Sequence, residues 1–312
     1  MFSRIQARLG ALLDKFEKPI QWLITLCGWS SIIFVVAIFF FIFKEAAPVF
    51  PHLNWGEFFF SHRWIPVPAE GNEPVYGAMG IMYGTFAITV VSMFIAMPLG
   101  LGAAVYISEF ATPKLKETLK ILIEFLAAIP SIIWGFIGLV IMGPIIQNVF
   151  GIEVGVNLLN ASIVVGLMAV PLIVSISEDS LRAVPDSYRE ASLALGASKW
   201  EMIYRVLFPA AKNGLLAACM LGVGRAVGET MAVWMASGGT DNMPTNYFDP
   251  MLLLERVKAL TATIAGEIPE TVHGSEHYQV LFVIGIVLLM ISVVINVVSD
   301  LIIKGIHTDK NA

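Results

Sequence analysis

The chain has 312 residues, of which 57% are hydrophobic and only 14% are charged, and its mean hydropathy is +0.79. Soluble domains carry about 25% charged residues, so these charges are too few to cover a soluble surface, and we expect a membrane protein. The net charge of -5 gives no indication of nucleic-acid binding. The 2 cysteines lie inside apolar runs, which excludes a disulfide framework and a cysteine metal cluster.

Residues 1–19 are predicted to form a cytoplasmic amphipathic segment before the first membrane span. Apolar side chains recur on one helical face with basic residues along the flank, a pattern that favours a helix lying at the membrane interface. An ordinary solvated helix start is an equally good interpretation. The apolar positions are Ile5, Leu9, Leu12, Leu13 and Phe16.

Six apolar runs each reach the roughly 20 residues that a helix needs to cross a bilayer. We therefore predict an all-α polytopic membrane protein with six transmembrane helices, at residues 20–43, 79–107, 121–145, 161–180, 213–236 and 278–302. Its predicted parts after residue 19 are the first helix with an outer loop (20–78), the main transmembrane domain (79–303) and a cytoplasmic tail (304–312).

Three of these runs contain a proline, which is expected to bend the helix: Pro98, Pro130 and Pro171. The stretch at 129–135 combines its bend with the hydroxyl of Ser131 and a glycine. One interpretation is a packing kink, and the other is part of a pathway lining, because freed backbone groups inside a membrane need protein or water as partners.

Lysine and arginine orient the spans, because they accumulate in cytoplasmic segments. With the N-terminus inside, the inner segments hold 14 of the 19 Lys and Arg residues and the outer segments hold 4. Both termini are therefore predicted to be cytoplasmic, together with the loop at 186–209.

This loop, called the 186–209 hairpin below, has the pattern of two short helices with a break. Gly196 suits the break because glycine can adopt positive φ. Two S-x-x-E sequences have the spacing of a helix-opening capping box, Ser187 to Glu190 and Ser198 to Glu201. A soluble helical hairpin between membrane spans is predicted to be a docking surface.

Two outer segments are long, at 44–78 and 237–277. The second contains a predicted amphipathic helix at 250–267 with an apolar face. Such a helix can pack under the outer ends of the spans or line an entry, and we favour packing.

The fifth run carries a charge near the middle of the bilayer. Arg225 lies about 18 Å along a helix from Asn213, at ~1.5 Å per residue, and a charged residue at this depth is by default a functional hypothesis. Glu229 follows at i+4 and could meet Arg225 on one face, while Gly224 and Gly228 permit close helix approach. The pair could neutralise itself within the bundle, or its guanidinium could bind a passing oxyanion through forked hydrogen bonds.

The sequence lacks the motifs that several classes of enzyme require. There is no Walker A sequence G-x-x-x-x-G-K-[ST] and no H-E-x-x-H, and no span carries a histidine or lysine to act as the base of a serine protease. We therefore expect no catalytic residues, no metal and no cofactor bound by this chain.

The 186–209 hairpin resembles the EAA loop of ABC-importer membrane subunits, in which E-A-A, three residues, glycine and nine residues precede I-x-L-P. Here Glu190-Ala191-Ser192 is followed by Gly196 and then by Val206-Leu207-Phe208-Pro209, so the spacing matches throughout and the departures are conservative. The resemblance implies a type I importer permease core. It also implies that the hairpin docks on a separate ATPase subunit, through Glu190, Ala191, Gly196, Trp200 and Pro209.

Within that superfamily the chain is similar to the phosphate-specific permeases of the PstC type. The matching stretches are 64–66, 84–85, 124–131, 225–233 and 260–265. The run from Arg225 to Thr230 suggests phosphate, and the Met-Ala-Val that follows is typical of PstC, whereas the paired PstA subunit has Ala-Pro-Leu there. The resulting candidate substrate pathway consists of Arg225, Glu229, Thr230 and Ser131.

The resemblance implies an assembly in a bacterial inner membrane. The chain would sit beside a homologous permease of the PstA type, a dimer of PstB-type ATPase subunits that uses the ATP, and an external phosphate-binding protein of the PstS type. One alternative is a permease for molybdate, sulfate or thiosulfate. A stand-alone anion channel or carrier is disfavoured because it has no motor to dock, and a sensor or scaffold that signals phosphate status would be an added role.

Overall fold

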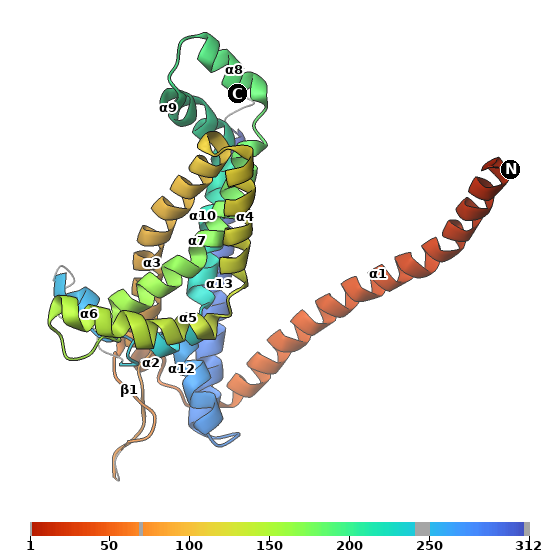
Figure 1. The fold of residues 1–312 in the computed structure, drawn as a ribbon. Helices are drawn as coiled ribbons and strands as arrows, with labels where there is room; N and C mark the ends of the chain where they lie inside the picture. Colours follow the sequence, from red (N-terminus) through yellow and green to blue (C-terminus); the bar gives the residue numbers. More distant parts are fainter. Residues whose placement is uncertain (1, 69–70, 241–249, 309–312) are drawn as a thin grey trace.

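The computed structural model describes residues 2–68, 71–240 and 250–308, which form a bundle of helices with one small β-hairpin (Figure 1). Six helical stretches are long and apolar enough to cross a membrane: Pro19–Val49, Met79–Phe110, Ser131–Phe150, Leu158–Arg182, Lys199–Gly228 and Glu276–Ile302. The predicted all-α fold with six spans is confirmed. Parts of the predicted outer loop and tail, 241–249 and 309–312, lie outside the described residues, and the proposed domain limits stay predictions.

The centre of the bundle is the pair α3 (Met79–Val105) and α7 (Leu158–Arg182), against which α10 (Phe208–Gly228) packs. Lipid tails are as apolar as leucine side chains, so close packing rather than hydrophobicity joins helices in a membrane. A small residue provides close approach here, because a Cβ atom on Gly100 of α3 would lie only 2.6 Å from the side chain of Ile173 on α7.

The first helix, α1 (Phe2–Ala46), runs without interruption through Pro19 and stands away from the bundle (Figure 1). It joins the rest of the chain near its end, where the rings of Phe41 and Phe282 lie 5.6 Å apart and α1 packs on α13 (Glu276–Thr308). Helix α1 is thus continuous across the predicted limit of the N-terminal segment at residue 19, and the limit itself stays a prediction. The interfacial placement of that segment stays a prediction.

The third predicted span is wrong as a single helix. The chain forms α4 (Pro113–Ala128), breaks at Ile129 and Pro130, and continues as α5 (Ser131–Ile137), a π-helical turn (Gly138–Met142) and α6 (Gly143–Phe150). Ile129 is extended at φ −66° and ψ 122°, as a following proline favours. As a result α4 runs along the bundle while α5 and α6 cross it (Figure 1).

The fifth predicted span is also interrupted. Helix α10 ends at Gly228, Glu229 is extended at φ −70° and ψ 130°, and α11 (Met231–Ala236) starts after Thr230. No proline causes this break, and the sequence pattern did not indicate it. By contrast, Pro98 and Pro171 lie inside the continuous helices α3 and α7.

The 186–209 hairpin contains α8 (Asp186–Ala194), α9 (Lys199–Met202) and a π-helical turn (Ile203–Leu207) that leads into α10. The predicted pair of short helices is thus confirmed. Gly196 separates them at φ +84°, a backbone conformation that costs glycine little. Figure 1 places the hairpin at one end of the bundle, called the hairpin end, beside the start of α4.

One of the two predicted capping boxes is present. The hydroxyl of Ser198 accepts a hydrogen bond from Glu201 N at 3.3 Å, and the Glu201 carboxylate accepts one from Ser198 N at 2.9 Å. The other box, at Ser187, is wrong, because α8 begins at Asp186 and its N-cap is Pro185.

The opposite end of the bundle carries the shorter elements of the two long loops. The first loop holds a 3₁₀ turn (Ala47–Val49), α2 (Trp55–Phe60) and the strands β1 (Trp64–Ile65) and β2 (Val75–Tyr76), which pair antiparallel. The second holds a 3₁₀ helix (Pro250–Leu254), α12 (Leu260–Glu267) and a further 3₁₀ turn (Ile268–Glu270).

The predicted helix at 250–267 is therefore wrong as one piece. Val257 is extended and forms an isolated parallel bridge with Gly238, and only the second half continues as an α-helix. The preference for packing is confirmed, because Leu260 and Thr263 are fully buried and α12 contacts α3, α11 and α13.

Glu267, the last residue of α12, joins four segments at this end. Its carboxylate accepts hydrogen bonds from Trp64 Nε1 at 3.0 Å, contacts His277 Nε2 at 2.8 Å and pairs with Lys258. Burial, with a contribution from nearby Glu276, raises the pKa of Tyr76 in the adjoining strand to about 12, so Tyr76 is neutral at physiological pH.

The close approach of α3 to the segment before α12 yields a stability prediction. A Cβ atom on Gly84 would overlap the carbonyl oxygen of Lys258, so Gly84→Ala should destabilise the protein by about 1–3 kcal/mol through overpacking. Thermal unfolding of the purified protein in detergent should show a lower midpoint. Gly102→Ala is the matched control, since Gly102 lies in the same helix with open space around it, and equal midpoints for both variants would contradict the prediction.

Candidate functional site

The break between α10 and α11 is held in place by α12. The carbonyl oxygen of Glu229 accepts a hydrogen bond from Thr261 Oγ1 at 2.8 Å, and the Glu229 carboxylate accepts one from Thr230 N at 3.2 Å. The Thr230 hydroxyl donates to the carbonyl oxygen of Gly228 at 3.2 Å. Backbone groups freed by the break thus find partners inside the protein, as a membrane requires. Thr261 was missed as a site residue, although it lies in one of the stretches that resemble the PstC type.

Arg225 lies in the last turn of α10 and is half-buried. The predicted i, i+4 pair with Glu229 is wrong: no ion pair joins these two residues in the part of the chain that the structure describes. The reason is that Glu229 has left the helix, which removes it from the face on which Arg225 lies. The self-neutralising pair is therefore not formed, and the guanidinium is available for another anion.

Ser131 is brought toward the same break by the packing of α5 on α11. A Cβ atom on Gly135 would lie 3.0 Å from the Cα atom of Ala232, and one on Gly138 would lie 3.0 Å from Ala236. These contacts advance together along both helices, so the helices run parallel, with Gly135 level with Ala232. Ser131 lies one turn before Gly135, and one turn before Ala232 is the end of α10, so Ser131 lies on the side of the break rather than beside the body of α11.

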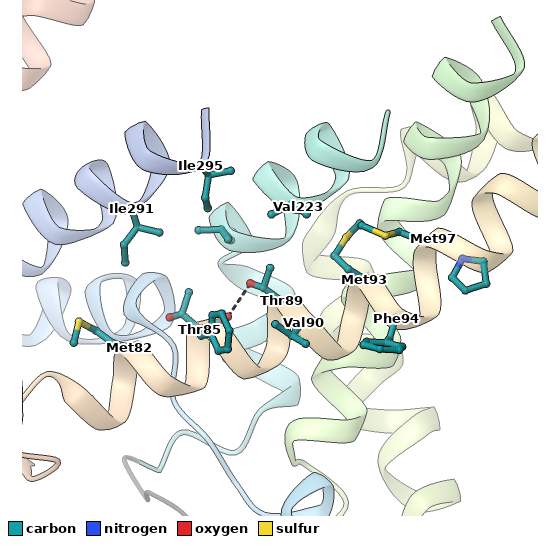
Figure 2. Close-up of a pocket in the computed structure, with 13 residues that line it drawn as sticks. Met82, Thr85, Thr89, Val90, Met93, Phe94, Met97, Val223, Ile291 and Ile295 are labelled. Carbon is teal, nitrogen blue, oxygen red and sulfur yellow. Dashed lines mark hydrogen bonds between the residues drawn. The ribbon is translucent and has the colours of Figure 1, made fainter. Parts of the chain in front are cut away.

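A cavity of about 730 Å³ lies between α3, α10 and α13, and Figure 2 shows its lining. The lining is apolar except for two threonines, and Thr89 donates its hydroxyl hydrogen to the Thr85 carbonyl oxygen at 2.7 Å. Val223 and Val227 of α10 contribute to it, whereas Arg225 is two positions away, about 200° around the helix axis. This cavity is thus unsuited to an anion, and Arg225 lies on the other side of α10.

The 186–209 hairpin exposes the residues predicted for docking. Glu190, Ala191, Gly196 and Pro209 are solvent-exposed, and Trp200 is 67% exposed. Large apolar side chains surround them, with 90% of Leu195 exposed. Exposed apolar side chains that gather on one segment are typical of protein-interaction surfaces. The structure thus brings the predicted docking residues together on one hairpin. Pro209 also lines a cavity of about 470 Å³ with Tyr188, Arg205 and Val206.

Sequence reasoning missed the anchor of this hairpin. Arg189 of α8 forms a two-point ion pair with Glu109, through Nε at 3.2 Å and Nη2 at 2.9 Å. Glu109 lies in a π-helical turn (Tyr106–Phe110) at the end of α3. The hydrogen bond to Glu109 raises the pKa of Arg189. Both residues are visible in the sequence as charges, but 80 positions separate them.

A second buried carboxylate joins α4 to α7 at the hairpin end. Glu178 is 1% exposed and pairs with Lys116 Nζ at 2.6 Å and with Lys120. A buried charge is costly unless it is paired, so these lysines explain how Glu178 can lie in the bundle.

The pattern of one protein family, the binding-protein-dependent transport system inner membrane components, matches residues 96–308. The chain is 37% identical to a probable ABC transporter permease protein, YqgH, of Bacillus subtilis, over 92% of this chain and 90% of that protein. It is 32% identical to the phosphate transport system permease protein PstC of Haemophilus influenzae, over 82% of this chain and 83% of the relative. PstC 1 of Mycobacterium tuberculosis is 33% identical over 79% and 81%.

Solved structures share the fold at lower identity. A bacterial ABC transporter involved in the import of the acidic polysaccharide alginate has a TM-score of 0.62 and 12% identity, covering 91% of this chain and 95% of that chain. The MetNI methionine ABC transporter in an inward-facing conformation has a TM-score of 0.54 and 23% identity, covering 72% and 93%. The family match, the relatives and the fold agree. The chain therefore belongs to the binding-protein-dependent transport system inner membrane components, and within that family it groups with the relatives named PstC.

Proposed function

We propose that the chain is the permease subunit of an ATP-driven importer that moves inorganic phosphate from an external binding protein into the cytoplasm. The observation that carries this proposal is its similarity to phosphate permeases named PstC over about four-fifths of both chains. It is supported by Arg225, which is half-buried beside a helix break and has no ion pair among the residues that the structure describes.

The substrate pathway passes the break between α10 and α11. The Arg225 guanidinium meets the oxyanion through forked hydrogen bonds, and the Ser131 hydroxyl offers a further donor. The Thr230 hydroxyl joins the pathway by exchanging its hydrogen bond to the Gly228 carbonyl oxygen for one to the anion. The Glu229 carboxylate accepts a hydrogen bond from a protonated oxygen of the anion. Phosphate keeps a proton at neutral pH, so this group distinguishes phosphate from fully ionised oxyanions.

ATP is hydrolysed by a separate subunit, since this sequence has no Walker A motif, and the chain itself binds no cofactor. The exposed surface of the 186–209 hairpin docks on an ATPase dimer of the PstB type. The remaining partners are a homologous permease of the PstA type and a phosphate-binding protein of the PstS type.

The protein lies in a bacterial inner membrane with both termini and the hairpin end in the cytoplasm. The hairpin end carries the basic residues of α4, α8, α9 and the start of α10, as expected for a cytoplasmic face. A stand-alone channel or carrier is disfavoured by the docking surface. A permease for molybdate, sulfate or thiosulfate is the competing substrate assignment.

The substrate can be tested by uptake of labelled phosphate, sulfate and molybdate into cells with and without the gene. We expect ATP-dependent uptake of phosphate to require the gene. Phosphate should be preferred because the Glu229 carboxylate can accept a hydrogen bond from its protonated oxygen while Arg225 binds the anion. ATP-dependent uptake of sulfate or molybdate without phosphate would contradict the substrate assignment.

Arg225→Gln should leave the complex assembled while transport fails. The change removes a charge-assisted hydrogen bond of about 1.5–3 kcal/mol, so phosphate uptake should fall by at least about tenfold. Arg182→Gln, an exposed arginine at the end of α7, is the matched control and should transport normally. Normal uptake by the Arg225 variant would make that residue structural.

Changes on the hairpin surface should uncouple ATP hydrolysis from transport. Glu190→Lys reverses an exposed charge, and Gly196→Pro cannot adopt the observed φ of +84°. ATP hydrolysis and uptake measured in the same membrane vesicles should show a lower transport yield for both variants. Ser187→Ala is the control, because Ser187 forms no helix cap. Unchanged coupling in both variants would remove the docking proposal.

A further inference from the structure

We propose that the Glu109–Arg189 ion pair transmits movement of the 186–209 hairpin to α3, and through α3 to the break at Glu229. Both residues would be positioning residues for transport, since neither reaches the substrate pathway. This inference rests on the proposed docking of an ATPase at the hairpin. It names the link by which that docking would reach the anion path.

Every N–H group of the Arg189 guanidinium has a partner. Besides the two contacts with Glu109, Nη1 donates to the carbonyl oxygen of Val184 at 2.7 Å and contacts Asp186 at 3.2 Å, and Nη2 donates to the carbonyl oxygen of Leu181 at 2.9 Å. The carbonyl of Leu181 lies in the last turn of α7, and that of Val184 lies two residues after the helix ends. One side chain therefore holds α8 on both α7 and α3.

Of the two ion pairs of Arg189, the buried one with Glu109 should resist separation more than the exposed one with Asp186. The side chain of Glu109 is 6% exposed and that of Arg189 is 17% exposed, whereas that of Asp186 is 87% exposed. Glu109 also accepts a hydrogen bond from Ser108 at 2.7 Å. A two-point ion pair has a fixed geometry, and breaking a buried pair costs much free energy because it leaves an uncompensated charge. An exposed ion pair contributes little to stability.

Helix α3 then connects the hairpin end to the α12 end. Its 27 residues span about 40 Å as one helix, and the π-helical turn at Tyr106–Phe110 is of a type that frequently marks functional positions. Near its other end, Thr85 Oγ1 accepts a hydrogen bond from Leu260 N, the first residue of α12, at 2.9 Å. The next residue, Thr261, holds the carbonyl oxygen of Glu229. An unbroken series of contacts thus runs from Arg189 to the anion path.

Coupling can be carried by such networks of hydrogen bonds and rigid helices. The Glu178 cluster offers no equivalent route, because the ion pairs described for Lys116 and Lys120 are with Glu178 and Asp179 of α7 and not with residues of the hairpin. Apolar side chains of the hairpin also pack on α3, and the Glu109–Arg189 pair adds the polar, directional contact between them.

The test uses two carboxylate-to-amide variants that each alter one partner of Arg189. Glu109→Gln removes the two-point pair with α3 and keeps the caps on α7, and Asp186→Asn removes the exposed pair. Each variant is expressed with its permease partner, ATPase subunits and binding protein, and the complex is reconstituted in vesicles. Three quantities are measured: ATPase content of the purified complex, basal ATP hydrolysis, and phosphate transported per ATP with loaded binding protein.

For Glu109→Gln we expect normal ATPase content and basal hydrolysis, with transport per ATP reduced about tenfold. Asp186→Asn should match the wild type. Normal transport per ATP in Glu109→Gln would overturn the inference, and so would loss of the ATPase from that complex, because the pair would then build the docking surface. If the wild-type chain itself bound no ATPase, the proposed function would fail, and this inference with it.

Discussion

Lipid offers no hydrogen bonds to a polypeptide backbone, and this constraint decides where the helices of this chain can be interrupted. Two irregular stretches within the spans, the break after Gly228 and the π-helical turn at Gly138–Met142, are satisfied by side chains from neighbouring helices. Thr261 of α12 binds the Glu229 carbonyl oxygen, and the buried Asn160 amide donates to the carbonyl oxygen of Gly138 in the π-helical turn at 2.9 Å. The irregular backbone is thus built into the packing, and its polar groups find partners inside the protein rather than facing lipid.

Because a charge is costly in low-dielectric surroundings, it matters which charged residues of the spans have an ion-pair partner. Glu109 and Glu178 lie at the hairpin end with cationic partners, so their role is to hold helices together. Arg225 has no carboxylate partner in the part of the chain that the structure describes, although a charge near the middle of a bilayer costs at least ~2.5–3.5 kcal/mol on insertion scales. A cation kept at that cost without a protein partner fits a residue that meets its anion only during transport.

These two regions lie at different depths of one bundle, and α3 and α12 connect them. The hairpin presents large apolar side chains outward while its inner residues, among them Met202, Ile203 and Leu207, share a buried cluster with α3 and α7. Apolar burial keeps the hairpin rigid against the bundle, and the Glu109–Arg189 pair adds a directional contact. A surface that binds a partner can therefore act on the α10–α11 break without touching it.

Features that depend on one segment of the chain were predictable from the sequence. They are the six spans, the two helices of the hairpin, the glycine break at Gly196 and the cap at Ser198. Each depends on spacing within a few residues, which hydropathy, capping and turn chemistry determine locally. The interruption after Gly228 and the separation of Arg225 from Glu229 were decided by tertiary structure. So were the Glu109–Arg189 pair and the approach of Ser131 to the break, because residues far apart in the chain meet only where helix packing and the need to satisfy buried polar groups place them.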